Sequence, residues 1–353
     1  MAAQKRYDNL DGLRTYACLG IIAMHIFANS DYKIQNWFGT DFIPSLNLGV
    51  YLFLIISGFG MFCGYYQKFR DECVDLNEFY KKRYLRLLPF FSILVLIDVL
   101  IEHSVSSTIE GITEITMVFG LLPNNQPSVI GVGWTLGVIF LFYMLFPFFV
   151  FLCWTKRRAW ISFLSAIILN IFLTAHWLKP QFVVKTIDPR HNFLYCAMFF
   201  LSGGVLYFYQ DSIKKYVQRF KYSFILVLTC TCVAFYVFVF NKLSGQWLDK
   251  YSLVLFMIIA IYAIGAQSRV LSNKFTKAIS TISFEMYLSH MLVFRAVQTT
   301  GLLYILGKGI SGYVFAFICV TVICSILVIL YKRLEKIVAK YLVARLNKKF
   351  DRN

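Results

Sequence analysis

Long apolar stretches dominate this sequence and predict transmembrane helices. A helix that crosses roughly 30 Å of hydrocarbon needs about 20 mostly apolar residues. Ten such stretches cover residues 12–29, 46–66, 87–102, 133–154, 159–178, 191–209, 221–240, 249–268, 278–298 and 312–332. A shorter apolar run, 112–122, lies between Gly111 and Pro123, so we expect a re-entrant or interfacial segment there. The pattern predicts an all-α fold, a polytopic membrane helix bundle of about ten transmembrane helices.

The basic residues fall mainly in alternate connections between these stretches. Of the 35 Lys and Arg residues, 27 lie in one set of alternate connections and ends, and seven lie in the opposite set. Arg295, near the outer end of the ninth stretch, completes the total. Because Lys and Arg favour the cytoplasmic side of a membrane, the richer set is predicted to be cytoplasmic. This set includes both termini, and the clear alternation supports the count of spans.

The organisation along the chain is simple. No linker or internal repeat interrupts the apolar stretches, so residues 1–335 are expected to form one membrane domain. Residues 336–353 form a basic cytoplasmic tail. The alternation of basic and apolar residues there predicts an amphipathic helix on the inner leaflet.

Composition and charge exclude several other classes of protein. Of the 353 residues, 59% are hydrophobic and 18% aromatic, which is more apolar surface than one soluble core can bury. The net charge of +17 would suit nucleic acid, but no soluble stretch is long enough to carry such a site. We therefore expect no nucleic-acid partner and contact with anionic lipid headgroups instead. The nine cysteines have neither metal-site spacing nor a disulfide framework, and no metal is expected.

Two polar residues within the first stretch are candidate functional groups. Arg14 and His25 are eleven residues apart, about three helical turns, so they share one helix face with His25 about 16 Å further into the membrane. Each also has a structural interpretation. Arg14 could be a snorkelling residue that sets topology, and His25 could bond to a neighbouring helix. An ionisable residue inside a membrane is nevertheless costly and therefore a candidate for function.

Two other segments carry similar groups. The ninth stretch contains SFEMYLSH, in which Ser283, Tyr287 and His290 share one side and could line a common cavity with the first stretch. The segment EFYKKRYLRLLP places Arg83 and Arg86 at i and i+3 on one face of a helix that enters the membrane. Two arginines there could bind phosphates through bidentate hydrogen bonds, or could only anchor the topology.

Small and aromatic residues near the span ends have simpler interpretations. Ser57, Gly58 and Gly60 of the second stretch are interpreted mainly as packing residues that let helices approach closely. Trp134 is most simply an interfacial aromatic residue, and it could also stack on a sugar ring.

These motifs together resemble the acyltransferase 3 family of bacterial membrane acyltransferases. The resemblance is carried in order by LDGLRTYACLGIIAMH (10–25), GVYLFLIISGFGM (49–61), FYKKRYLRLLPFF (79–91), WTLGVIFLFYMLFP (134–147) and ISFEMYLSH (282–290). It extends over most of the chain. The most specific features are the spacing of Arg14 and His25, the SGF of the second stretch and the paired arginines before the third.

The resemblance implies a membrane acyltransferase domain of ten helices in the cytoplasmic (inner) membrane. Its members take an acyl group, usually acetyl, from cytoplasmic acyl-coenzyme A and transfer it to a hydroxyl of an extracytoplasmic or lipid-linked glycan. By position, His25 matches the family's essential histidine and Arg14 its partner arginine. Arg83 and Arg86 match the pair associated with coenzyme A. The implied enzyme is an acetyl-CoA-dependent O-acetyltransferase whose partners are acyl-coenzyme A, a carbohydrate acceptor and the lipid bilayer.

One departure from the family pattern and several alternatives remain. Many members have a Glu in the fourth-span motif where this sequence has Ile139. His25 could act as a general base or could carry the acyl group itself. A multi-spanning transporter or flippase of a glycan or small anionic metabolite would also show buried ionisable residues, and a sensor or scaffold is a third alternative. The acceptor, the acyl group and a homo-oligomeric state stay open.

Overall fold

Helices of very different length make up the protein in the computed structural model. The structure describes residues 7–121, 129–178, 188–240, 242–243 and 245–350, and it describes side chains up to residue 341. The helices are α1 (Asp8–Ala28), α2 (Ile43–Ser45), α3 (Gly49–Met61), α4 (Gln67–Arg70), α5 (Leu76–Glu102), α6 (Val105–Ile115), α7 (Trp134–Met144), α8 (Phe146–Leu152), α9 (Lys156–Phe172), α10 (Phe193–Arg219), α11 (Lys221–Ala234), α12 (Gln246–Gly265), α13 (Lys274–Ser280), α14 (Ser283–Thr299) and α15 (Ile310–Phe350).

The predicted all-α polytopic bundle is confirmed. Within the described residues, eight helices, some continued by short helical turns, are long and apolar enough to cross a membrane. The pair α7 and α8, bent by 60°, is also apolar enough and forms either a ninth, broken span or a re-entrant segment. The ninth predicted stretch is divided between α13 and α14, and α14 has 17 residues. Of the apolar run 112–122, the described residues 112–121 fall in the short helix α6 and the turn after it, and the eleven residues of α6 span only about 16 Å. Residue 122 lies outside the described residues.

Two local sequence features determine where the helices near the candidate site begin and bend. The side chain of Asp75 accepts hydrogen bonds from the backbone N–H groups of Asn77 and Glu78, so α5 begins at Leu76, well before the apolar stretch predicted from residue 87. Pro147 lies in the first turn of α8, where its missing N–H ends the helical ladder of α7 and accounts for the bend.

Packing in the bundle is closest where α3 crosses α10. A Cβ added at Gly58 would lie 2.1 Å from the carbonyl oxygen of Phe200, and one at Gly203 would lie 2.3 Å from that of Ile55. Gly58 therefore has the packing role predicted for it. Gly60 does not, because nothing lies within 4 Å of its Cβ position. α10 also packs on α9 and α12, while α1 packs on α3, α13 and α14.

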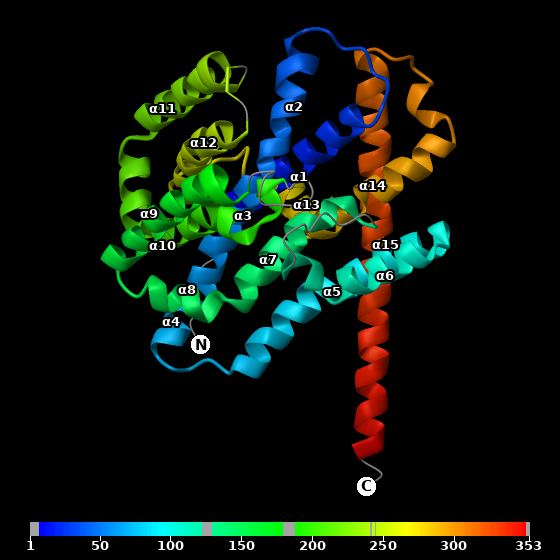
Figure 1. Cartoon of the computed structure of the whole chain (residues 1–353), viewed down its shortest axis with the longest axis horizontal. Helices are drawn as coiled ribbons and strands as arrows, with labels where there is room; N and C mark the ends of the chain where they lie inside the picture. The colour runs from blue at the N-terminus through cyan, green and yellow to red at the C-terminus, as the bar shows by residue number, and fades with distance from the viewer. Residues whose placement is uncertain (1–6, 122–128, 179–187, 241, 244, 351–353) are drawn as a thin grey trace.

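The last helix is continuous from the membrane into the basic tail. α15 runs from Ile310 to Phe350 without a break at residue 335, where the tail was expected to begin. Figure 1 shows α15 along one side of the bundle, with its C-terminal part extending beyond the other helices. The connection between α4 and α5 lies toward the same end of the molecule in this view. Lys and Arg are frequent in the tail and in the helix ends that flank this connection, Lys68 and Arg70 in α4 and Lys81, Lys82 and Arg83 in α5. These basic segments, which the sequence predicts to be cytoplasmic, thus lie toward one end of the molecule (Figure 1).

We predict that Gly58→Ala destabilises the folded protein, because the new methyl group would overlap the backbone of α10. Overpacking of this kind typically costs about 1–3 kcal/mol, so the melting temperature of the detergent-solubilised protein should fall by several degrees. Gly60→Ala is the matched control and should melt like the unsubstituted protein. Equal melting temperatures for the two variants would contradict the close crossing.

Candidate functional site

A cavity of about 620 Å³ lies between α1, α3, α5, α7 and α14. Its lining side chains that can donate or accept hydrogen bonds are Arg14, Ser57, Tyr65, Lys68, Lys82, Arg83, Arg86, Thr135, Tyr143, Ser283 and Tyr287. Lys68 and Lys82 are exposed, so the cavity opens on the basic side of the protein. Five of the predicted site residues are therefore brought together from three helices.

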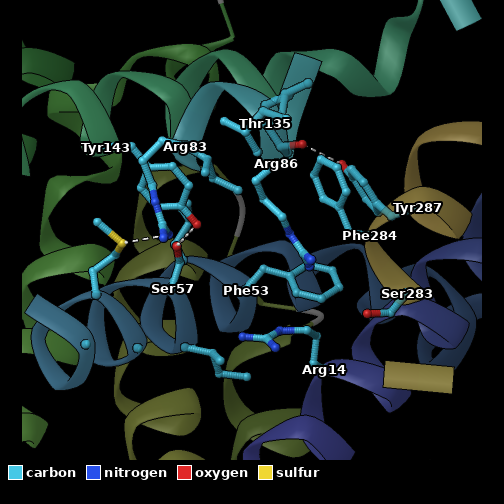
Figure 2. Close-up of a pocket in the computed structure, with 18 of the residues that line it drawn as sticks. Arg14, Phe53, Ser57, Arg83, Arg86, Thr135, Tyr143, Ser283, Phe284 and Tyr287 are labelled. Atoms are coloured by element: carbon cyan, nitrogen blue, oxygen red, sulfur yellow. Dashed lines mark hydrogen bonds between the residues drawn. The ribbon is translucent and has the colours of Figure 1, made fainter. Parts of the chain in front are cut away.

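Three guanidinium groups converge on this cavity. Arg14 comes from α1, and Arg83 and Arg86 come from successive turns of α5. Figure 2 shows the three side chains directed into the same space from opposite walls. The i and i+3 spacing in α5 predicted the shared face of Arg83 and Arg86, whereas their meeting with Arg14 depends on how α1 and α5 pack in the bundle.

The contacts of Arg83 and Arg86 orient them without neutralising them. Arg83 Nη2 donates to Tyr65 Oη at 2.9 Å, and Arg86 Cζ lies 5.6 Å from the centroid of the Phe284 ring. Neither arginine forms an ion pair with any residue that the structure describes. The Nε of Arg83 is buried and has no hydrogen-bond partner among those residues. Both side chains therefore retain donors for an anion.

The charge of the cavity wall is positive throughout. Among the described residues, its lining includes Arg14, Lys68, Lys82, Arg83 and Arg86 and no Asp or Glu. Two of these cations have a carboxylate nearby outside the wall: Arg14 Nη1 lies 3.3 Å from Asp11 Oδ1, and Lys82 Nζ lies 3.8 Å from Glu78 Oε2. Cations held together in partly desolvated surroundings repel one another unless a counter-charge is present. The cavity is therefore suited to a ligand with several negative charges.

The end of the cavity away from the lysines is mostly apolar. Thr135 Oγ1 donates to Tyr287 Oη at 3.0 Å, and the ring of Phe53 packs edge-to-face on Tyr287 with centroids 5.7 Å apart. Figure 2 shows Thr135 and Tyr287 side by side at one edge of the cavity. Ile139 is also part of the wall. The family resemblance implies that many members have a carboxylate at this position, and here the wall is apolar instead.

The two histidines lie beyond this end of the cavity. His25 is in the last turn of α1 and half-buried, whereas His290 is in the middle of α14 and fully buried. Their ring centroids are 5.1 Å apart, at an interplanar angle of 51°. Neither lines the cavity, and the ring of Tyr287, which does, lies 5.9 Å from that of His290. The expected common cavity thus contains Ser283 and Tyr287, while His290 contacts His25 outside it.

Trp134 takes part in a contact that the sequence did not suggest. Its ring stacks on His191, with centroids 4.6 Å apart and planes 23° from parallel. Burial lowers the pKa of His191 to about 4, so the stacked ring is neutral near pH 7. One face of Trp134 is therefore covered by protein. His191 lies 57 positions along the chain, and no local pattern connects the two residues.

Lys68 and Lys82 are cavity residues that sequence reasoning missed. Both belong to the basic connection between the second and third predicted spans, where topology alone accounts for lysines. Lys82 also lies within 3.8 Å of Glu78 Oε2, on the exposed side of α5. Nothing in their spacing separates them from Lys81, which does not line the cavity.

Comparisons with known proteins agree with the resemblance drawn from the motifs. The family model described as an acyltransferase domain matches residues 7–329. The chain is also 34% identical over 107 residues to the O-acetyltransferase OatA of Staphylococcus aureus, in strains NCTC 8325, COL and MRSA252. That similarity covers 30% of this chain and only 15% of the length of each relative. No solved structure matches the chain.

We predict that a small polyanion stabilises the protein by occupying the cationic cavity. Saturating pyrophosphate, at constant ionic strength, should raise the melting temperature by about 2–5 °C because it binds only the folded state. Arg86→Gln should lose at least half of this shift. Lys81→Gln is the matched control, since it removes the same charge from the same helix outside the cavity. Equal losses in both variants would indicate general screening rather than a site.

Proposed function

The chain belongs to the acyltransferase domain family, and from this premise we propose that it is a membrane O-acyltransferase. The donor is cytoplasmic acyl-coenzyme A, with acetyl as the acyl group, and the acceptor is a hydroxyl of an extracytoplasmic or lipid-linked carbohydrate. The observation that carries this proposal is the cavity whose wall has five cations and no acid and whose apolar end approaches the His25 and His290 pair. The name of the staphylococcal relative, an O-acetyltransferase, supports an oxygen acceptor and an acetyl group.

The cavity fits the phosphate-bearing part of coenzyme A in charge and size. Its volume of about 620 Å³ is within the range of roughly 300–1,000 Å³ typical of small-molecule sites. In the proposed complex, Arg83 and Arg86 bind phosphate oxygens with the donors that the protein leaves free, and Lys68 and Lys82 lie at the opening. The positive charge of the wall would be balanced by the ligand.

The reach of the donor matches the distance between the two ends of the site. Arg14 and His25 are eleven residues apart in one unbroken helix, about 16 Å along its axis. A pantetheine arm is on the order of 15–20 Å long by chain geometry. With its phosphates at the arginines, the thioester would lie near Phe53 and Tyr287. One of these two rings must turn aside for the thioester to meet His25.

We assign His25 the role of general base. It lies in the last turn of α1, toward the predicted outer side, and is half-buried, so an acceptor hydroxyl can approach it from there. A neutral imidazole takes the hydroxyl proton as the oxygen attacks the thioester carbonyl. A covalent acyl-imidazole on His25 is the alternative course, and it would label the protein itself when labelled donor is supplied without acceptor.

The decisive experiment measures donor cleavage and binding in the same membranes. Vesicles that contain the protein, supplied with labelled acetyl-CoA, should release free thiol and transfer label to a carbohydrate. His25→Ala should reduce this turnover by about 10²–10⁴-fold while acetyl-CoA still binds, because His25 lies outside the cavity. Arg86→Gln should weaken donor binding by about tenfold or more, and Lys81→Gln should leave it unchanged.

The same experiment separates the competing functions. A transporter or flippase would move an anion or glycan across the vesicle membrane without releasing thiol. A sensor or scaffold would bind acetyl-CoA and neither cleave it nor transport it. Unchanged turnover in His25→Ala would remove that histidine from the mechanism whichever function is found.

A further inference from the structure

The proton on His290 is fixed by its own helix. Its Nδ1 lies 2.6 Å from the backbone carbonyl oxygen of Tyr287, one turn earlier in α14. A carbonyl oxygen can only accept a hydrogen bond, so Nδ1 carries the proton. In a neutral ring the other nitrogen, Nε2, then has a free lone pair. The helix thus presents His290 as a hydrogen-bond acceptor at Nε2.

That acceptor has no partner among the residues that the structure describes. His290 has no exposed surface, and its Nε2 is one of the buried polar atoms without a hydrogen bond. A buried acceptor without a partner destabilises the folded protein, so its presence calls for a functional explanation. Two polar rings lie near it, those of Tyr287 and His25. The hydroxyl of Tyr287 donates its proton to the backbone carbonyl oxygen of Val132 at 3.3 Å, which leaves His25.

The separation of the two imidazoles is that of a hydrogen-bonded pair. A ring nitrogen lies about 1.2 Å from the centre of its ring, so an in-line N–H···N bond of about 2.9 Å places the centres about 5.3 Å apart. The observed centroid separation is 5.1 Å, with the planes 51° apart. The axis of the Cβ–Cγ bond passes close to the centre of an imidazole ring. Rotation about this bond therefore moves the nitrogens and leaves the ring centre almost in place. The centroid separation therefore allows an N–H···N bond after a turn of the half-buried His25 ring.

We propose that His290 is a positioning residue that sets the tautomer and direction of His25. The inference rests on the proposed function of His25 as general base. In the aligned pair, one nitrogen of His25 donates its N–H to Nε2 of His290. The other nitrogen of His25 is then unprotonated and directed away from α14, where the acceptor hydroxyl would arrive. His290 itself touches neither substrate.

The proton and electron balance of transfer follows from this arrangement. The acceptor oxygen attacks the thioester carbonyl carbon as its proton moves to the free nitrogen of His25. The carbon–sulfur bond breaks, and its electron pair leaves on sulfur. The imidazolium of His25, whose second N–H is held by His290, returns a proton to the thiolate. The products are the acyl ester and free coenzyme A, and His25 ends in its initial tautomer.

Two substitutions of His290 that differ in reach test this proposal. In His290→Gln the amide oxygen can lie near the position of Nε2 and accept from His25. In His290→Asn the shorter amide reaches only the Nδ1 position, where it can bond to the Tyr287 carbonyl but not to His25. Both variants remove the ring, so a purely structural role predicts similar losses in both. Melting temperature and acetyl-CoA affinity are measured alongside turnover.

We expect His290→Asn to lower kcat for thiol release by about 10–100-fold, as for a misdirected general base, with the KM for acetyl-CoA unchanged. His290→Gln should recover most of that loss at a similar melting temperature. The proposal is overturned if the Asn variant keeps normal kcat, if the Gln and Asn variants lose equally, or if the losses follow melting temperature. Absence of thiol release by the unsubstituted protein would instead overturn the proposed function and this inference with it.

Discussion

Repulsion among cations that share one partly desolvated cavity is the interaction on which the arrangement of the site depends. Arg14, Arg83 and Arg86 are held by helices that meet through packing, and the two arginines of α5 have no ion-pair partner in the described residues. A partly desolvated charge without a partner destabilises the folded protein. At Ile139, where the resemblance implies that relatives carry Glu, the wall is apolar. The missing negative charge is what a polyanionic ligand would supply.

Helix α1 carries both a cationic residue of the cavity and the proposed general base. One rigid helix of 21 residues carries Arg14 in its first half and His25 in its last turn. The separation between the anion-binding end and the reacting end is therefore set by helical rise and not by loop conformation. In the proposed reaction this fixed length selects a donor whose phosphates and thioester are separated by a long, thin, uncharged arm.

Much of this site could be predicted from the sequence because its spacings are local. The eleven residues from Arg14 to His25 and the three from Arg83 to Arg86 fix relative directions within single helices. The side shared by Ser283 and Tyr287 is predicted for the same reason. Contacts between distant segments could not be predicted. The Thr135–Tyr287 bond joins residues 152 positions apart, and the Trp134–His191 stack joins α7 to a turn before α10.

The helix boundaries show the same limit. Hydropathy finds the apolar part of α5 but not its beginning, because the first turns are polar and are stabilised by the Asp75 cap. It finds the fourth apolar stretch but not the bend of 60°, which Pro147 imposes in the middle of apolar sequence. Conversely, the break between α13 and α14 falls within a stretch that hydropathy predicts as continuous. Apolar length indicates membrane residence, whereas caps and prolines decide geometry.

The placement of Phe53 and Tyr287 has a consequence for any enzyme that works across a membrane. A permanent polar passage from the cationic cavity to the half-buried His25 would admit water and protons and would expose a thioester to hydrolysis. Here the packed rings of Phe53 and Tyr287 and the Thr135–Tyr287 hydrogen bond form part of the cavity wall, and neither His25 nor His290 lines the cavity. A single hydrogen bond of this kind contributes only about 1 kcal/mol net, so the energy of a bound donor is ample to displace it. In the proposed reaction, the passage from the cavity to His25 would therefore open only where a bound donor displaces these contacts.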